Sequence, residues 1–171
     1  MLAMNLHIRL LDAGDIQPIA DAFQTLGWNK PASRYERYLS EQQSGDRVVF
    51  VAFENNIFAG YVTLNWLAEY PPFRDKNIPE IRDFNVLPQF RRRGIGTRLM
   101  EAAEQTVAQR LPIVGLGVGL DPDYGAAQRL YVRQGYIPDG RGLYTNGVWV
   151  KWGMQVTVDD NLALYFTKQL R

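Results

Sequence analysis

The stretch Val86–Thr97 reads VLPQFRRRGIGT and joins an apolar strand to an amphipathic helix through a basic turn with two glycines. The first turn of a helix leaves about four backbone N–H groups without intrahelical partners, and the helix dipole places about half a positive charge there. Gly94 and Gly96 keep side chains away from these N–H groups, and Arg91–Arg93 add charged donors beside them. The stretch therefore predicts a site for an anionic group such as a diphosphate.

A solvated arginine cluster beside a plain tight turn is the alternative interpretation of Arg91–Arg93. Positive charge at a helix N-terminus is unfavourable to the helix dipole unless an anion compensates it. This mismatch favours a bound phosphate.

Composition limits the classes of function. The chain has 171 residues, of which 46% are hydrophobic, and this predicts one domain over residues 1–171. Nineteen basic and eighteen acidic residues give a net charge of +1, so the arginine cluster is local and nucleic acid is not expected as a partner. The absence of cysteine excludes disulfides, thiolate metal sites and acyl intermediates on an enzyme sulfur. His7 is the single histidine and opens a strand, which disfavours a histidine-activated nucleophile.

The sequence contains no run of about 20 apolar residues and no small-residue cleavage signal near its start. We therefore expect a soluble cytoplasmic protein that does not enter a membrane.

Hydrophobic periodicity predicts the element order βααβββαβαββ, a mixed sheet with helices on its faces. The expected strands cover residues 7–11, 48–53, 57–66, 81–86, 112–120, a segment starting at 136 and 161–167, and the expected helices cover 16–26, a segment ending at Gly45, 94–110 and 124–134. Residues 71–76 are predicted as a loop. The glycines of the strand 112–120 predict close approach by another backbone or a ligand.

Two motifs in this order, Arg91-x-x-Gly94-x-Gly96 and Leu130-Tyr131-x-x-x-Gly135-Tyr136, lie about 40 residues apart on the expected elements. Together they resemble the GNAT superfamily of acetyl-CoA-dependent N-acyltransferases, and the resemblance covers nearly the whole chain. It implies an α/β (α+β) fold with a mixed, mostly antiparallel sheet of six to seven strands and about four helices. It also implies that the fourth and fifth strands splay apart and open a cleft for the pantetheine arm of the cofactor.

The resemblance implies acetyl-CoA as co-substrate and no metal. The coenzyme A diphosphate would lie on the N–H groups of Arg93–Thr97, and one arginine could reach the ribose phosphate. The candidate cofactor-binding residues are Phe84, Val86, Arg91, Arg92, Arg93, Gly94, Ile95, Gly96, Thr97 and Gln128. Family members often carry an asparagine where this chain has Tyr124, so a backbone group, Gln128 or ring packing against the pantetheine would replace that contact.

The resemblance also implies that Tyr131 donates a proton to the departing thiolate. A phenol with a pKa of about 10 stays protonated at neutral pH and can act as a general acid. The alternative is an ordinary core tyrosine, since the neighbouring Leu130 packs inward.

The acceptor amine must lose a proton before it attacks, so we expect a carboxylate near the cleft. Glu80 and Asp83 lie on the strand that leads into the basic turn, and strand alternation predicts that only one of them faces the cleft. We select Glu80, which matches a position where many relatives have an acid. A surface salt bridge with Arg82 or Arg74 is the alternative role for Glu80.

These inferences favour an N-acetyltransferase that acts by direct attack of a primary amine of a small molecule. The candidate acceptor-pocket residues are Trp28, Asn65, Trp66, Glu69, Tyr70 and the segment 144–152. Acetylation of a protein N-terminus or lysine, and non-catalytic sensing of acyl-CoA, remain alternatives. The sequence leaves the oligomeric state open, a homodimer included.

Overall fold

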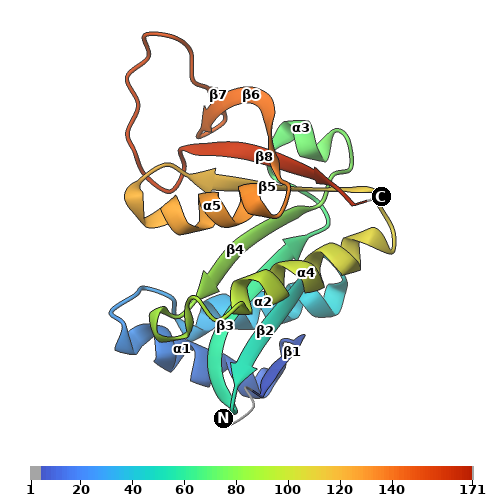
Figure 1. Cartoon of the computed structure of the whole chain (residues 1–171), viewed down its shortest axis with the longest axis vertical. Helices are drawn as coiled ribbons and strands as arrows, with labels where there is room; N and C mark the ends of the chain where they lie inside the picture. The colour runs from blue at the N-terminus through green and yellow to red at the C-terminus, as the bar shows by residue number, and fades with distance from the viewer. Residues whose placement is uncertain (1–4, 171) are drawn as a thin grey trace.

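The computed structural model describes residues 5–170, which form one eight-stranded sheet in the order β1-β2-β3-β4-β5-β8-β6-β7 (Figure 1). The strands are β1 Leu6–Leu10, β2 Arg47–Glu54, β3 Ile57–Asn65, β4 Glu80–Val86, β5 Ile113–Gly119, β6 Ile137–Thr145, β7 Val148–Trp149 and β8 Ala163–Gln169. The helices are α1 Ile16–Thr25, α2 Ala32–Ser44, α3 Pro71–Arg74, α4 Ile95–Ala108 and α5 Gly125–Arg133, with short 3-10 turns at Ala13–Asp15, Pro88–Phe90 and Pro122–Tyr124.

The predicted mixed sheet is confirmed, with two differences. The short strand β7 forms a hairpin with β6 and brings the sheet to eight strands instead of six to seven. The segment predicted as a loop contains the one-turn helix α3, because Pro71 and Pro72 fit the first turn of a helix, where N–H groups lack partners anyway. Within residues 5–170, no helix combines the length and hydropathy that a bilayer crossing requires.

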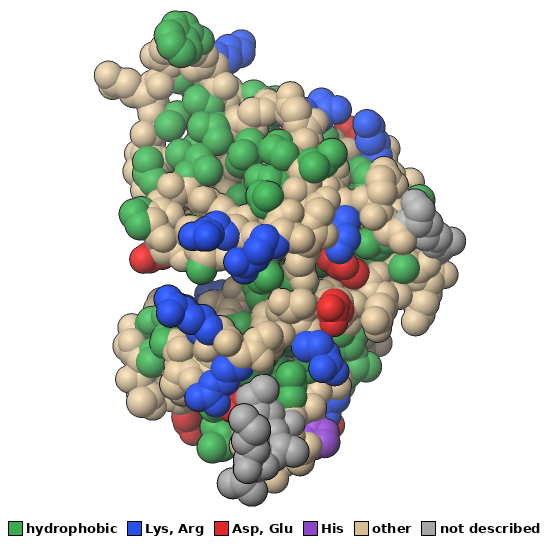
Figure 2. Space-filling model, viewed as in Figure 1, with side chains coloured by type: hydrophobic (Ala, Val, Ile, Leu, Met, Phe, Trp, Pro, Cys, Tyr) green, Lys and Arg blue, Asp and Glu red, His purple; other side chains and the backbone are tan. Residues whose placement is uncertain are grey.

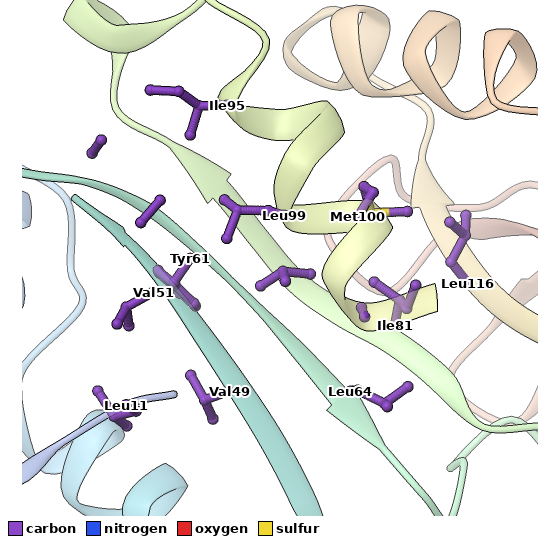
Figure 3. Close-up of a cluster of buried hydrophobic side chains, with 14 of the residues drawn as sticks. Leu11, Val49, Val51, Tyr61, Leu64, Ile81, Ile95, Leu99, Met100 and Leu116 are labelled. Carbon is purple, nitrogen blue, oxygen red and sulfur yellow. The ribbon is translucent and has the colours of Figure 1, made fainter. Parts of the chain in front are cut away.

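Helix α4 covers one face of the sheet, and α1 and α2 cover the other, as Figure 1 shows. Leu99 and Met100 of α4 are fully buried against the strands (Figure 3). On the opposite face, the ring of Tyr61 meets Phe23 of α1 and Tyr35 of α2 edge to face, with centroids 5.9 and 5.5 Å apart. Both faces of β2 and β3 are therefore packed, which fixes the middle of the sheet.

Strands β4 and β5 are the only parallel pair among the described strands, and they separate after two residues. Glu80 pairs with Gly115 and Ile81 with Leu116, and no further pairs follow toward Val86. The expected splay between the fourth and fifth strands is confirmed.

A β-bulge in β4 lies where the two strands separate. The register against β3 shifts between Tyr61 and Thr63, and Asp83 has φ = 44°, which is unusual for a residue with a side chain. The extra residue changes the alternation, so Asp83 joins Glu80 and Arg82 on the face of α1 and α2. The prediction that strand alternation places Glu80 and Asp83 on opposite faces was wrong, since alternation holds only for a strand without a bulge.

The glycines of β5 make room for aromatic rings. A Cβ atom at Gly115 would lie 2.2 Å from Phe73, at Gly117 2.8 Å from Tyr165, and at Gly119 2.4 Å from Tyr124. Close approach is present, but the approaching groups are aromatic side chains, whereas the prediction named another backbone or a ligand.

Candidate active site

The basic turn has the backbone of an anion-binding site. Arg92 and Gly94 have positive φ angles of 61° and 78°, and α4 begins directly after Gly94. No side chain caps the helix, and its first hydrogen bond runs from Arg98 N to Gly94 O. The N–H groups of residues 95–97 therefore have no intrahelical acceptor and are free to bind an anion.

The three arginines of the turn differ in their contacts. Arg91 Nε donates to the Val86 carbonyl at 3.1 Å, and Arg93 Nη1 lies 2.6 Å from Oε2 of Glu54, which is only 3% exposed. Arg92 is exposed and makes no hydrogen bond or ion pair with any residue in the range 5–170. Two of the predicted phosphate ligands thus hold the turn in place, and Arg92 has its whole guanidinium group available.

We expect Arg92→Ala to raise the KM for acetyl-CoA by roughly 5-fold, which corresponds to about 1 kcal/mol, and to leave the thermal midpoint unchanged. Arg93→Ala is expected to lower the free energy of unfolding by about 2 kcal/mol, because it leaves a buried carboxylate unpaired. Steady-state kinetics and thermal unfolding of both variants check this division. Equal effects of the two variants on both quantities would contradict it.

The turn, β4 and α5 meet at Phe84. A Cβ atom at Gly96 would lie 3.0 Å from Phe84 Cζ and 3.6 Å from Leu130 and Val86, so a larger residue would press on all three. The Phe84 ring lies 6.3 Å from the ring of Tyr131. The structure thus brings the predicted cofactor-binding residues beside the predicted general acid.

Tyr131 is buried, with 6% of its surface exposed, and its hydroxyl makes no hydrogen bond within the described residues. Burial raises the pKa of Tyr131, and the nearby Tyr124 adds to the shift. The neighbouring Tyr136 differs, since its hydroxyl donates to Glu104 Oε1 at 2.9 Å. Tyr131 therefore offers a protonated phenol whose hydrogen is not used by the fold.

Gln128 and Tyr124 lie at the end of β5. Gln128 Nε2 donates to the Gly119 carbonyl at 2.8 Å, so the amide nitrogen is engaged with the splayed strand. Tyr124 packs its ring on Gly119 and donates its hydroxyl to Asp160 at 2.8 Å. Both side chains thus border the splay from the side of β5.

Glu80 lies at the closed end of the splay and is 3% exposed. Its Oε1 is 3.9 Å from Arg82 Nε, whereas Arg82 approaches Glu69 to 2.6 Å. Burial raises the pKa of Glu80 to about 7; Arg82 opposes the shift and the charge of Glu69 adds to it. The alternative ion pair of Glu80 with Arg82 is therefore present at the limit of ion-pair distance, but the carboxyl in it is buried and not at the surface.

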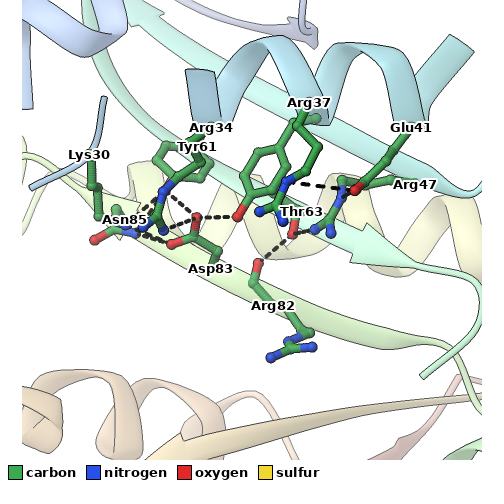
Figure 4. Close-up of polar contacts among 11 residues, drawn as sticks. Lys30, Arg34, Arg37, Glu41, Arg47, Tyr61, Thr63, Arg82, Asp83 and Asn85 are labelled. Carbon is green, nitrogen blue, oxygen red and sulfur yellow. Dashed lines mark hydrogen bonds and ion pairs between the residues drawn. The ribbon is translucent and has the colours of Figure 1, made fainter. Parts of the chain in front are cut away.

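Asp83 is the centre of a polar network between β4 and the α1–α2 region (Figure 4). Its Oδ1 receives Lys30 at 2.7 Å and Asn85 at 3.0 Å, and its Oδ2 receives Tyr61 at 2.5 Å and Tyr38 at 2.8 Å. Burial alone would raise the pKa of Asp83, but the ion pair with Lys30 and these hydroxyls lower it below the usual value. Asp83 therefore stays ionised and saturated with donors, which makes it a poor proton acceptor. Sequence reasoning missed this network because its members come from four separate segments.

Two of the tryptophans predicted for an acceptor pocket have packing roles. Trp28 stacks on Phe23 with centroids 5.6 Å apart. The guanidinium carbon of Arg110 lies over the Trp66 ring, 4.4 Å from the ring centroid. Trp152, in the segment after β7, is fully exposed.

Three residues of that set, Tyr70, Tyr144 and Trp149, form an aromatic cluster together with Tyr165 of β8, which was not predicted for the pocket. Tyr70 stacks on Tyr165 with centroids 3.6 Å apart, and Tyr144 lies 5.2 Å from Tyr70 and 5.1 Å from Trp149. The cluster lies over β5 and β8, on the face where the glycines of β5 make room for rings. Glu80 lies on the same side of the sheet.

A notch opens at one edge of the molecule (Figure 2), between α5 and the basic turn that precedes α4 in the same view of Figure 1. Lys and Arg side chains lie on both of its sides. Its position matches the cleft expected between the splayed strands, and its charge suits a phosphorylated carrier.

Solved structures share this fold. An N-acetyltransferase from Staphylococcus aureus Mu50 is 19% identical, with a TM-score of 0.71 over 98% of this chain and 99% of that one. The protein yncA from Salmonella typhimurium, solved with its cofactor acetyl-CoA, is 20% identical, with a TM-score of 0.69 over 97% and 94%. A ribosomal-protein-alanine N-acetyltransferase from Brucella melitensis is 18% identical, with a TM-score of 0.69 over 95% and 99%. No curated protein matches the sequence significantly.

The model of the acetyltransferase (GNAT) family matches residues 15–136, and the chain belongs to that family. It is therefore an acetyl-CoA-dependent acyltransferase, as its two sequence motifs predicted.

Proposed function

We propose that this enzyme, acting as one domain, transfers the acetyl group of acetyl-CoA to a primary amine of a small molecule by direct attack. Tyr131 is the general acid and Glu80 the general base. The observation that carries the proposal is that the anion-binding turn and Tyr131 both lie beside Phe84. They lie at the splay between β4 and β5, and Glu80 lies at the closed end of that splay.

The turn fits the diphosphate of coenzyme A. The N–H groups of residues 95–97 face outward from an uncapped helix, and Arg92 has no competing partner within residues 5–170. Bound there, acetyl-CoA would supply an activated thioester. Phe84 and Val86, which border Gly96, would line the pantetheine arm.

Tyr131 is suited to protonate a departing thiolate. Its raised pKa keeps the phenol protonated at neutral pH, and burial in the same apolar surroundings also raises the proton affinity of a thiolate placed beside it. Since its hydroxyl hydrogen is not used by the fold, the proton transfer breaks no structural hydrogen bond.

Glu80 is suited to deprotonate the acceptor. A primary ammonium has a pKa of about 10, and a base that titrates close to the working pH removes its proton most efficiently. The pKa of Glu80, raised by burial to about 7, meets this condition, whereas the lowered pKa of Asp83 does not.

The surroundings of Glu80 favour a small amine. The aromatic cluster limits the space for an acceptor on this face of the sheet. Two acidic residues lie beside the cluster: Glu69 is exposed, and Asp139 accepts a hydrogen bond from the Tyr70 hydroxyl at 2.8 Å. Aromatic walls with acids suit a compact cationic amine.

A panel of amines tests the proposal through the release of free thiol from acetyl-CoA. Small primary amines with an aromatic or alkyl body are expected to release thiol, and secondary or tertiary analogues to release much less. Turnover confined to peptides with a free N-terminus would reassign the enzyme to proteins. Binding of coenzyme A without thiol release for any amine would point to a sensor.

A further inference from the structure

Two buried polar atoms on neighbouring positions of β3 and β4 have no hydrogen-bond partner among residues 5–170: Oδ1 of Asn65 and Oε2 of Glu80. Asn65 is 8% exposed and Glu80 is 3% exposed. Buried polar atoms almost always have partners, so two unpaired ones at the same place need an explanation.

Asn65 and Glu80 lie directly opposite each other across β3 and β4. Opposed residues of an antiparallel pair have Cβ atoms about 5 Å apart and point to the same face. An amide oxygen and an ionised carboxylate are both acceptors, so these two atoms cannot bond to each other while Glu80 is charged. A single proton removes the conflict, because a protonated carboxyl can donate to the amide oxygen.

We propose that Asn65 is a positioning residue for the general base: its Oδ1 accepts the hydrogen bond of Glu80 once that carboxyl has taken the acceptor's proton. The inference rests on the proposed function of Glu80. In the step, an N–H bond of the ammonium breaks, an O–H bond forms at Oε2, and the amine keeps the electron pair with which it attacks. The O–H then donates to Asn65, and the proton later leaves to water.

The charged groups that face Glu80 come from several elements. Arg82 of β4 and Arg47 of β2 favour the ionised carboxylate. Glu69, in the segment after β3, acts in both directions: its charge favours the protonated form, and its backbone N–H, which donates to Glu80, favours the ionised form. Tyr165 of β8 also faces it.

Both arginines have closer partners than Glu80. Arg82 pairs with Glu69, and Arg47 pairs with Glu41. Burial remains the largest cause of the raised pKa of Glu80, and a hydrogen bond to the neutral form acts in the same direction.

The test is a titration of Glu80 by NMR in protein with ¹³C-labelled glutamate carboxyls, with the signal assigned by its loss in Glu80→Gln. Asn65→Ala is expected to lower the titration midpoint by roughly half a pH unit to one unit, because it removes the hydrogen bond of the neutral form and admits water. Asn65→Asp is expected to raise the upper midpoint above the wild-type value, because two adjacent carboxyls resist double ionisation. Gln17→Ala, which removes an exposed amide on α1, should leave the midpoint unchanged.

The pH profile of kcat/KM, measured on the same variants, separates the two proposals. If the NMR midpoint of Glu80 and the acidic limb of the kcat/KM profile shift in parallel, the result supports both Glu80 as the base and Asn65 as its positioning residue. An NMR shift without a change in the limb would remove Glu80 as the base and with it the positioning role of Asn65, and would leave only a structural hydrogen bond between the two residues. An unchanged NMR midpoint in both Asn65 variants would overturn the inference, whatever the rates do.

Discussion

Tyr131→Phe is expected to lower kcat by about 100-fold or more, with little change in the KM for acetyl-CoA or in the thermal midpoint. The large kinetic effect follows from the loss of the proton that the departing thiolate needs. The small structural effect follows because the hydroxyl makes no hydrogen bond within residues 5–170, so the variant loses no partner. Turnover at saturating acetyl-CoA, together with thermal unfolding, measures both quantities.

Tyr136→Phe is the matched control, since it removes a hydroxyl from the same motif. This hydroxyl donates to buried Glu104, whose other oxygen receives Lys168 at 2.6 Å. We expect a loss of about 2 kcal/mol of stability and a nearly unchanged kcat. If Tyr131→Phe retained full turnover, or lost stability as Tyr136→Phe does, Tyr131 would be a core tyrosine and not an acid.

The parts of the molecule that the sequence predicted well depend on local rules. Gly45 and Gly135 end their helices with φ of 87° and 88°, as helix C-terminal glycines do. Asn55 and Asn56 form the tight turn between β2 and β3 with positive φ angles of 51° and 65°. The anion-binding turn belongs to the same class, because strand, glycines and helix start are adjacent in the chain.

The parts that sequence reasoning missed depend on contacts between distant segments. Arg91, Arg92 and Arg93 are identical residues, and only the fold assigns one to a strand carbonyl, one to Glu54 and one to solvent. No local feature of the sequence predicts the bulge at Asp83, because aspartate adopts a positive φ only rarely. Partners from β3 and the α1–α2 region hold Asp83 in this conformation. Because of this one residue, Glu80 and Asp83 lie on the same face of the sheet and not on opposite faces.

Asp83→Asn is expected to lower the free energy of unfolding by about 3 kcal/mol, because it leaves the buried ammonium of Lys30 without its counter-ion. Lys30 and Asp83 have only 15% and 17% of their side-chain surface exposed, so solvent does little to replace the pair. Asparagine keeps the shape of the side chain and tolerates positive φ, so the variant changes the charge and not the bulge. A fall of about 8 °C in the thermal midpoint would correspond to this loss.

A double-mutant cycle with Lys30→Met isolates the ion pair from its surroundings. The double variant should be clearly more stable than the sum of the single effects predicts, since it leaves no unpaired charge between the two positions. The pH dependence gives an independent check. Because the pKa of Asp83 is lowered in the folded state, its contribution is fully present above the unfolded pKa of about 4 and is lost as the pH falls through the folded value. The stability gap between the wild type and Asp83→Asn should therefore stay constant from about pH 5 to pH 7 and narrow below about pH 4, and a gap that persists at low pH would show that the carboxylate charge is not its source.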